Sequence, residues 1–350
     1  MRDHSEYMHR CLQLARLGAG YVAPNPMVGA VLVHKNRIIG EGYHQLYGKA
    51  HAEVNCLDSV KAADRQLIAA STLYVSLEPC AHFGKTPPCA DLVILHRIPK
   101  VVVGSRDPFK AVDGKGIEKM QAAGIEVITG VLENECRELN KRFFTFHTKQ
   151  RPYIILKWAQ SANGCIAGPE KEGVGISQDL TNRLVHRWRS EEQAIAIGTA
   201  TALIDNPSLT TRHVSGPNPV RILLDKELKV PSTNAVLSDE ADTIVLNYHR
   251  EDKQDHVQYV KLTQDEPVVE QMTRVLYGFG MLSVIIEGGS LLLQSFIDAG
   301  CWDEARIITN PALVIPGGYK GPILREGELQ ESLTSGTDLV HIYRKHSSVQ

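Results

Sequence analysis

One histidine, one glutamate and two cysteines carry the strongest chemical signal in this sequence. His51 and Glu53 belong to the stretch HAEVNCL, and Cys80 and Cys89 belong to EPCAHFGKTPPC. Zinc prefers imidazole and thiolate ligands, and three protein ligands leave its fourth tetrahedral position to water. We therefore expect His51, Cys80 and Cys89 to bind one Zn²⁺ ion. Glu53 is then placed to take a proton from the water, which becomes a hydroxide nucleophile, and to pass it to a leaving amine.

The order of these four residues points to deamination. A His-x-Glu triplet followed by Pro-Cys is the signature of zinc nucleobase deaminases. One alternative is a structural zinc module that binds a partner, which His82 as a fourth ligand would support. A second alternative is a nucleoside, base or polynucleotide deaminase with an unrelated second domain. An aromatic content of 6% argues against a channel for single-stranded nucleic acid.

The composition excludes several classes of protein. Lysine plus arginine number 38 against 40 aspartates plus glutamates, so the net charge of −2 provides no basic field for nucleic acid. The N-terminal stretch MRDHSEYMHRCLQLARLGAG has no signal-peptide core, and no apolar run approaches the roughly 20 residues that span a bilayer. We expect a cytoplasmic protein without a nucleic-acid or membrane partner, whose seven cysteines are reduced.

The chain length and the apolar pattern indicate two α/β domains. At 350 residues the chain exceeds the usual size of one hydrophobic core. The first part contains the hairpin VGAVLV and RIIGEGY, a helix over about 52–63, and the strands TLYVSL, KVVVG and IEVIT. The strands YIILKWA, AIAIG, RILLD, TIVLN and SVIIEGG follow, with helical patterns between them. Such alternation predicts sheets covered by helices. We place the domains at 1–147 and 148–350.

The first half resembles a known family. The stretches PNPMVGAVLV and HAEVNCL, and the eight residues between Cys80 and Cys89, are similar to the bifunctional RibD family of riboflavin-biosynthesis deaminase/reductases. The resemblance covers nearly the whole chain. It implies a cytidine-deaminase-like fold that deaminates 2,5-diamino-6-(ribosylamino)pyrimidin-4-one 5′-phosphate. By the same resemblance, the substrate-binding residues are Asn25, His82, Lys85 and Thr86, although a solvated loop lysine is an equal alternative for Lys85.

The second half is harder to read from its residues alone. Arg189 and Arg212 carry guanidinium groups suited to a phosphate, and the alternative for Arg189 is a solvated helix face. In IIEGGSLLLQSF a glycine pair precedes a helix, whose first N–H groups can bind a phosphate. A plain strand-to-helix turn is the other interpretation. The stretch lacks a GxGxxG fingerprint, so we do not predict a Rossmann domain.

The same family resemblance supplies roles for these residues. It implies a dihydrofolate-reductase-like fold that uses NADPH to reduce the ribosyl group of 5-amino-6-(5-phosphoribosylamino)uracil to ribityl, and a homo-oligomer, dimer or tetramer. The implied NADPH contacts are Ala159, Thr201, Asp205, Gly289, Ser290, Leu291, Leu292, Leu293, Gln294 and Ser295. The implied substrate contacts are Arg189, Leu209, Arg212 and Glu287. Gly173 and Gly175 stand where the family typically has serine and tryptophan, which removes a stacking surface for the cofactor.

Overall fold

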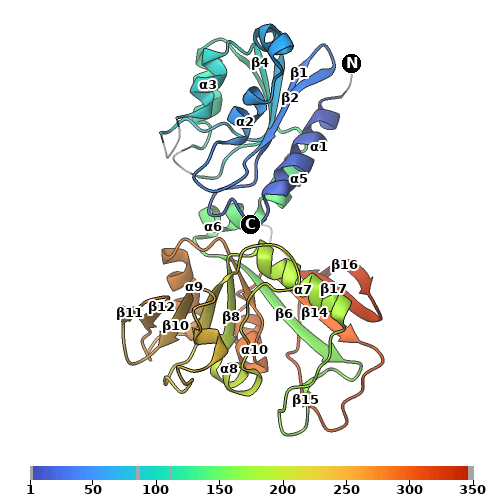
Figure 1. Ribbon diagram of the computed structural model, residues 1–350, viewed down its shortest axis with the longest axis vertical. Helices are drawn as coiled ribbons and strands as arrows, with labels where there is room; N and C mark the ends of the chain where they lie inside the picture. Colours follow the sequence, from blue (N-terminus) through green and yellow to red (C-terminus); the bar gives the residue numbers. More distant parts are fainter. Residues whose placement is uncertain (1–2, 84–86, 110–111, 346–350) are drawn as a thin grey trace. The chain divides into compact units, whose positions relative to one another are not determined.

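The chain folds into two compact units, Met1–Gln150 and Arg151–Gln350 (Figure 1). The structure is a computed structural model that describes residues 3–83, 87–109 and 112–345. Each unit has its own sheet and hydrophobic core. The predicted substrate residues Lys85 and Thr86 lie outside the described residues.

The first unit is built on a five-stranded sheet with the order β2-β1-β3-β4-β5. Its strands are β1 (Gly29–His34), β2 (Arg37–Tyr43), β3 (Thr72–Leu77), β4 (Lys100–Ser105) and β5 (Glu126–Thr129). Its helices are α1 (His4–Ala15), α2 (Ala52–Asp58), α3 (Cys89–Leu95), α4 (Lys115–Ala122), α5 (Glu133–Leu139) and α6 (Lys141–Lys149). Strand β1 is antiparallel to β2 and β3, whereas β3, β4 and β5 are parallel.

Helices cover both faces of this sheet, because its strands are apolar on both sides. In β4, Val101 and Val103 face the core that α2, α3 and α4 cover, and Val102 faces the core under α1 and α5. All three valines are fully buried. The result is the helix–sheet–helix arrangement that the sequence predicts. Helix α2 is shorter than expected: it ends at Asp58, and a short 3₁₀ helix follows at Ala62–Ala70.

The second unit contains a ten-stranded sheet with the order β11-β12-β10-β9-β8-β13-β6-β14-β17-β16, and the strands β7 and β15 pair separately. Its strands are β6 (Tyr153–Ser161), β7 (Cys165–Ala167), β8 (Ala194–Gly198), β9 (Val220–Leu224), β10 (Thr243–Asn247), β11 (Asp252–Gln254), β12 (Val257–Lys261), β13 (Ser283–Ile286), β14 (Glu304–Asn310), β15 (Tyr319–Lys320), β16 (Glu328–Ser335) and β17 (Asp338–Arg344). Its helices are α7 (Asp179–Glu191), α8 (Thr199–Asp205), α9 (Val268–Gly278) and α10 (Ser290–Asp298), with a 3₁₀ turn at Ala235–Leu237.

Seven strands of this sheet, from β12 through β14 in spatial order, run parallel. Helices α9 and α10 pack on one face and α7 and α8 on the other. The carboxyl ends of parallel strands meet at one edge, where open α/β sheets bind their ligands. A binding site is therefore expected after β6, β8 and β13. Within the described residues, no helix combines the length and apolar character needed to cross a membrane.

Candidate metal centre and reductase site

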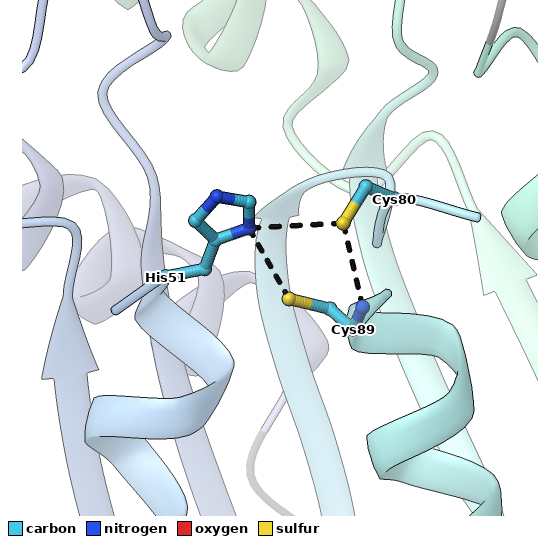
Figure 2. Close-up of side chains that lie close together, drawn as sticks. All are labelled: His51, Cys80 and Cys89. Atoms are coloured by element: carbon cyan, nitrogen blue, oxygen red, sulfur yellow. Dashed lines mark hydrogen bonds between the residues drawn. The ribbon is translucent and has the colours of Figure 1, made fainter. Parts of the chain in front are cut away.

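Three side chains from separate segments converge in the first unit (Figure 2). His51 directly precedes α2, Cys80 lies in the loop after β3, and Cys89 begins α3. The Nδ1 atom of His51 lies 3.7 Å from the Sγ of Cys80 and 3.3 Å from the Sγ of Cys89. Figure 2 shows the imidazole nitrogen directed at both sulfur atoms.

The donor set fits zinc in a reactive site. The three ligand atoms lie within 4.8 Å of one another, and they are one nitrogen and two sulfurs. His82 does not join them: among the described residues, the group of possible ligands is His51, Cys80 and Cys89. The exposed His82 ring packs instead against Phe109, with the ring centroids 6.0 Å apart. This geometry favours an open fourth position over a closed structural site.

The thiols of Cys80 and Cys89 differ in their pKa. The backbone N–H of Cys89 donates to the Sγ of Cys80 at 3.3 Å. The side-chain hydrogen bond from Cys89 lowers the pKa of Cys80 to about 4 against the opposing effect of burial, and His51 lowers it further. The same side-chain hydrogen bond and burial raise the pKa of Cys89. Cys80 is therefore the more acidic thiol of the pair, and a bound cation would favour the thiolate form of both.

Glu53 lies in the first turn of α2, beside this group. Its side chain is buried, and burial raises its pKa, with a further contribution from the charge on Cys80. It also shares a side-chain hydrogen bond with Cys89. A buried carboxyl group whose pKa is raised holds a proton more readily than an exposed one, which suits a general acid–base.

His44 orients Asn25, and the sequence analysis missed it. The Nδ1–H of His44 donates to the carbonyl oxygen of Ala50 at 3.0 Å, because a carbonyl only accepts. Its Nε2 is then an acceptor and receives the amide NH₂ of Asn25 at 3.1 Å. Burial lowers the pKa of His44, consistent with this neutral form. The only available signal was proximity, since His44 stands seven residues before His51.

In the second unit, Glu287 joins two cations in a buried cluster. It follows β13 and bonds the Nζ of Lys157 in β6 at 2.7 Å and the Nη2 of Arg189 in α7 at 2.9 Å. All three side chains are 10–12% exposed. Burial alone would raise the pKa of Glu287, but the positive charges of Arg189 and Lys157 outweigh it and lower the pKa to about 2. Lys157 was missed, although a lysine inside the apolar run YIILKWA was a signal.

The loop after α8 brings Arg212 toward the same cluster. The carbonyl oxygen of Thr210 accepts a hydrogen bond from Arg189 at 3.4 Å, and the backbone N–H of Arg212 donates to the Nδ1 of His186 at 3.0 Å. Leu209 is buried with a φ of 57°, a strained conformation for a leucine that often marks a functional segment. Three of the predicted substrate residues therefore share one region with Glu287: Arg189, Leu209 and Arg212.

Most of the predicted cofactor residues lie at the turn into α10 or on α10 itself. A Cβ at Gly288 would lie 2.9 Å from the Cγ2 of Thr201, and a Cβ at Gly289 would lie 3.3 Å from its Oγ1. The turn thus packs against α8 and requires glycine. The side chains of Leu292 and Leu293 belong to the core under α10, so they are not available to contact a cofactor. The remaining residues of this stretch are Ser290, Leu291, Gln294 and Ser295, all on α10.

Two other predicted NADPH contacts, Asp205 and Ala159, lie outside α10 and the turn before it. Asp205 ends α8, and a Cβ at Gly173 would lie 2.8 Å from its Oδ1, whereas a Cβ at Gly175 would meet nothing within 4 Å. Ala159 lies on β6 opposite Ile308 of β14. The role of Ala159 in binding NADPH stays a prediction.

The fold and the two sites define a class of protein, a zinc-type pyrimidine deaminase domain joined to a reductase domain. Residues 1–105 match the cytidine and deoxycytidylate deaminase zinc-binding region, and residues 152–349 match the RibD C-terminal domain. The chain is 39% identical to the riboflavin biosynthesis protein RibD of Aquifex aeolicus, over 97% of this chain and 98% of the relative. It is also 39% identical to RibD of Bacillus amyloliquefaciens, over 93% and 89%.

Solved structures match this chain over nearly its whole length. A diaminohydroxyphosphoribosylaminopyrimidine deaminase/5-amino-6-(5-phosphoribosylamino)uracil reductase from Thermotoga maritima is 36% identical and matches with a TM-score of 0.87, covering 98% of this chain and 99% of that one. Acinetobacter baumannii RibD matches at 28% identity with a TM-score of 0.90, over 98% and 99%. This chain belongs to the RibD family of riboflavin biosynthesis proteins. The predicted family and fold class are therefore confirmed.

Proposed function

We propose that this chain is a bifunctional riboflavin-biosynthesis enzyme. Its first activity is the hydrolytic deamination of 2,5-diamino-6-(ribosylamino)pyrimidin-4-one 5′-phosphate. Its second activity is the NADPH-dependent reduction of 5-amino-6-(5-phosphoribosylamino)uracil to the ribitylamino product. The main structural support for this proposal is the convergence of His51, Cys80 and Cys89 beside the buried Glu53.

In the deaminase, His51, Cys80 and Cys89 would hold Zn²⁺. When bound, zinc supplies Lewis acidity, which makes water a nucleophile at neutral pH. Glu53 accepts a proton from the attacking water and returns it to the amine that leaves as ammonia. Asn25, whose amide NH₂ donates one hydrogen bond to His44, would contact the pyrimidine through its amide group. His82 and the loop residues Lys85 and Thr86 would contact the rest of the ribotide.

In the reductase, the residues after β13 and around α8 would hold NADPH, which supplies the hydride when bound. The chain's own contribution is position and charge. Arg189 and Arg212 would bind the substrate phosphate, with Leu209 and Glu287 in contact with the ribosylaminopyrimidine. Lys157, fixed by Glu287, provides a proton donor next to these groups.

The two activities are assigned to residues 1–147 and 148–350, in that order. We further propose that the protein acts in the cytoplasm as a homo-oligomer. Small pyrimidine ribotides, and not nucleic acid, are its substrates. Size-exclusion chromatography with light scattering tests the oligomer directly, and a monomeric mass would contradict it.

A paired assay tests the proposed function. The purified protein receives the diaminopyrimidine ribotide, and ammonia is measured with and without a zinc chelator. Separately, NADPH oxidation is measured with the deaminated ribotide. We expect ammonia release that the chelator abolishes, and NADPH oxidation that it leaves intact. Ammonia release that resists complete removal of zinc would contradict the deaminase mechanism.

A further inference from the structure

An apolar ring stands exposed beside the loop that carries Cys80. Phe109 is 38% exposed, and its ring meets that of His82 edge-on with the centroids 6.0 Å apart. On its other side Phe109 packs on His147 at 5.0 Å, and His147 packs on Phe143 of α6 at 4.4 Å. A continuous series of rings therefore runs from α6 to the loop between the two cysteines.

The backbone that carries Phe109 is anchored to the metal-binding segment. Glu78 is buried two residues before Cys80, and its carboxylate accepts four backbone N–H groups, at 3.0–3.3 Å, from Asp107, Gly114, Gly116 and Ile117. A buried carboxylate is costly unless it is hydrogen-bonded, so these contacts fix the loop firmly. The backbone N–H of Phe109 donates to the Oδ1 of Asp107 at 2.8 Å.

Close packing adds to this anchor. A Cβ at Gly116 would lie 1.9 Å from the carbonyl oxygen of Pro79, so the start of α4 rests directly on the residue before Cys80. The position of Phe109 relative to the metal group is thus set by the fold. Because His82 contacts Phe109, a ligand that reaches His82 from the metal group also comes near the Phe109 ring.

We propose that Phe109 contributes to substrate binding in the deaminase, by orienting His82 and by offering an apolar face to the planar pyrimidine of the ribotide. This inference rests on the proposed deaminase function. Aromatic rings attract each other at centroid distances of 4.5–7 Å, and the substrate ring is planar and partly apolar. Phe109 holds no proton or metal, so its contribution is to binding and not to the chemical step.

The test compares zinc-loaded full-length variants by steady-state ammonia release with the diaminopyrimidine ribotide. Phe109→Ala should raise KM about 3- to 10-fold, the range that one aromatic contact represents, and leave kcat within about 2-fold. Phe109→Tyr should restore the wild-type KM. Phe83→Ala is the matched control, because Phe83 lies in the loop between the two cysteines and is 78% exposed, and the KM of this variant should not change.

Zinc content is measured on each sample. An unchanged KM in zinc-loaded Phe109→Ala, or an equal rise in Phe83→Ala, would overturn the inference while leaving the deaminase assignment intact. If the alanine variant fails to hold zinc, Phe109→Leu takes its place and an unchanged KM there has the same meaning. A wild-type protein that releases no ammonia would refute the proposed function and this inference together.

Discussion

Replacing Glu287 with glutamine tests the buried charge cluster of the reductase unit. The carboxylate is paired with Lys157 and Arg189, and its pKa in the folded protein is about 2, against an ordinary value of 4.5. A carboxyl whose pKa falls by this amount on folding contributes about 3 kcal/mol to the free energy of unfolding at neutral pH. Glu287→Gln leaves two buried cations without a countercharge, for which a loss of about 3 kcal/mol or more is expected.

The pH dependence of this loss identifies its cause. The folded pKa lies below the unfolded one, so the stabilisation is complete above about pH 5 and disappears as the pH falls from about 4.5 toward 2. Glutamine does not titrate in this range. The difference in unfolding free energy between wild type and Glu287→Gln should therefore shrink on acidification, from about 3 kcal/mol at pH 7 to about 1 kcal/mol near pH 3.

Urea unfolding followed by tryptophan fluorescence measures this difference selectively. The three tryptophans of the chain, Trp158, Trp188 and Trp302, all belong to the second unit, so their signal reports that unit. Ammonia release by the deaminase on the same sample controls for general damage. A free-energy difference that stays constant between neutral and acidic pH, or that is absent at neutral pH, would show that the Glu287 charge does not stabilise the second unit.

Three further predictions concern the reductase. Arg189→Ala should lower kcat/KM for the deaminated ribotide at least about 10-fold. Arg187 is 69% exposed and pairs with Glu191, so Arg187→Ala should stay within about 2-fold of wild type. Equal losses in the two variants would contradict a phosphate role for Arg189. His186→Leu removes the acceptor for the backbone N–H of Arg212 and should lower kcat/KM about 5-fold or more, whereas His186→Gln retains an acceptor and should keep most activity. Steady-state NADPH oxidation measures both variants, and equal losses would argue against a role for this hydrogen bond. Gly175→Trp supplies the missing indole where a side chain meets open space, so calorimetry should show a Kd for NADPH lowered about 2- to 10-fold; an unchanged Kd would exclude a stacking role at this position.

The sequence predicts the central strands of both sheets well, because apolar runs covered on both faces need no distant partner to be recognised. The three possible zinc ligands were also predictable from residue type and spacing, and the structure brings them together. The edge strand β16 was not predicted, because ELQESLTS is polar and largely exposed and shows no clear apolar alternation. Strand β14 was missed for a different reason, since the buried ion pair of Glu304 and Arg306 interrupts its apolar pattern.

Residues whose role depends on a distant partner also escaped the sequence analysis. The role of Lys157 depends on its ion pair with Glu287, which lies 130 residues further along the chain. His44 acquires its tautomer from Ala50 and only then orients Asn25. Neither relation has a sequence pattern that predicts it: the first joins strands far apart in the chain, and the second depends on a turn that brings the carbonyl of Ala50 onto the imidazole of His44.

The proton-transfer role of Glu53 is tested by the rate of ammonia release from zinc-loaded Glu53→Gln protein, measured against wild type of equal zinc content. Glutamine is close in size and shape to glutamate but cannot carry the proton from water to the leaving amine. The rate should fall about 100-fold or more with the zinc content unchanged, because general acid–base catalysis contributes on this scale. A variant that keeps its zinc and releases ammonia within a few-fold of the wild-type rate would contradict the account.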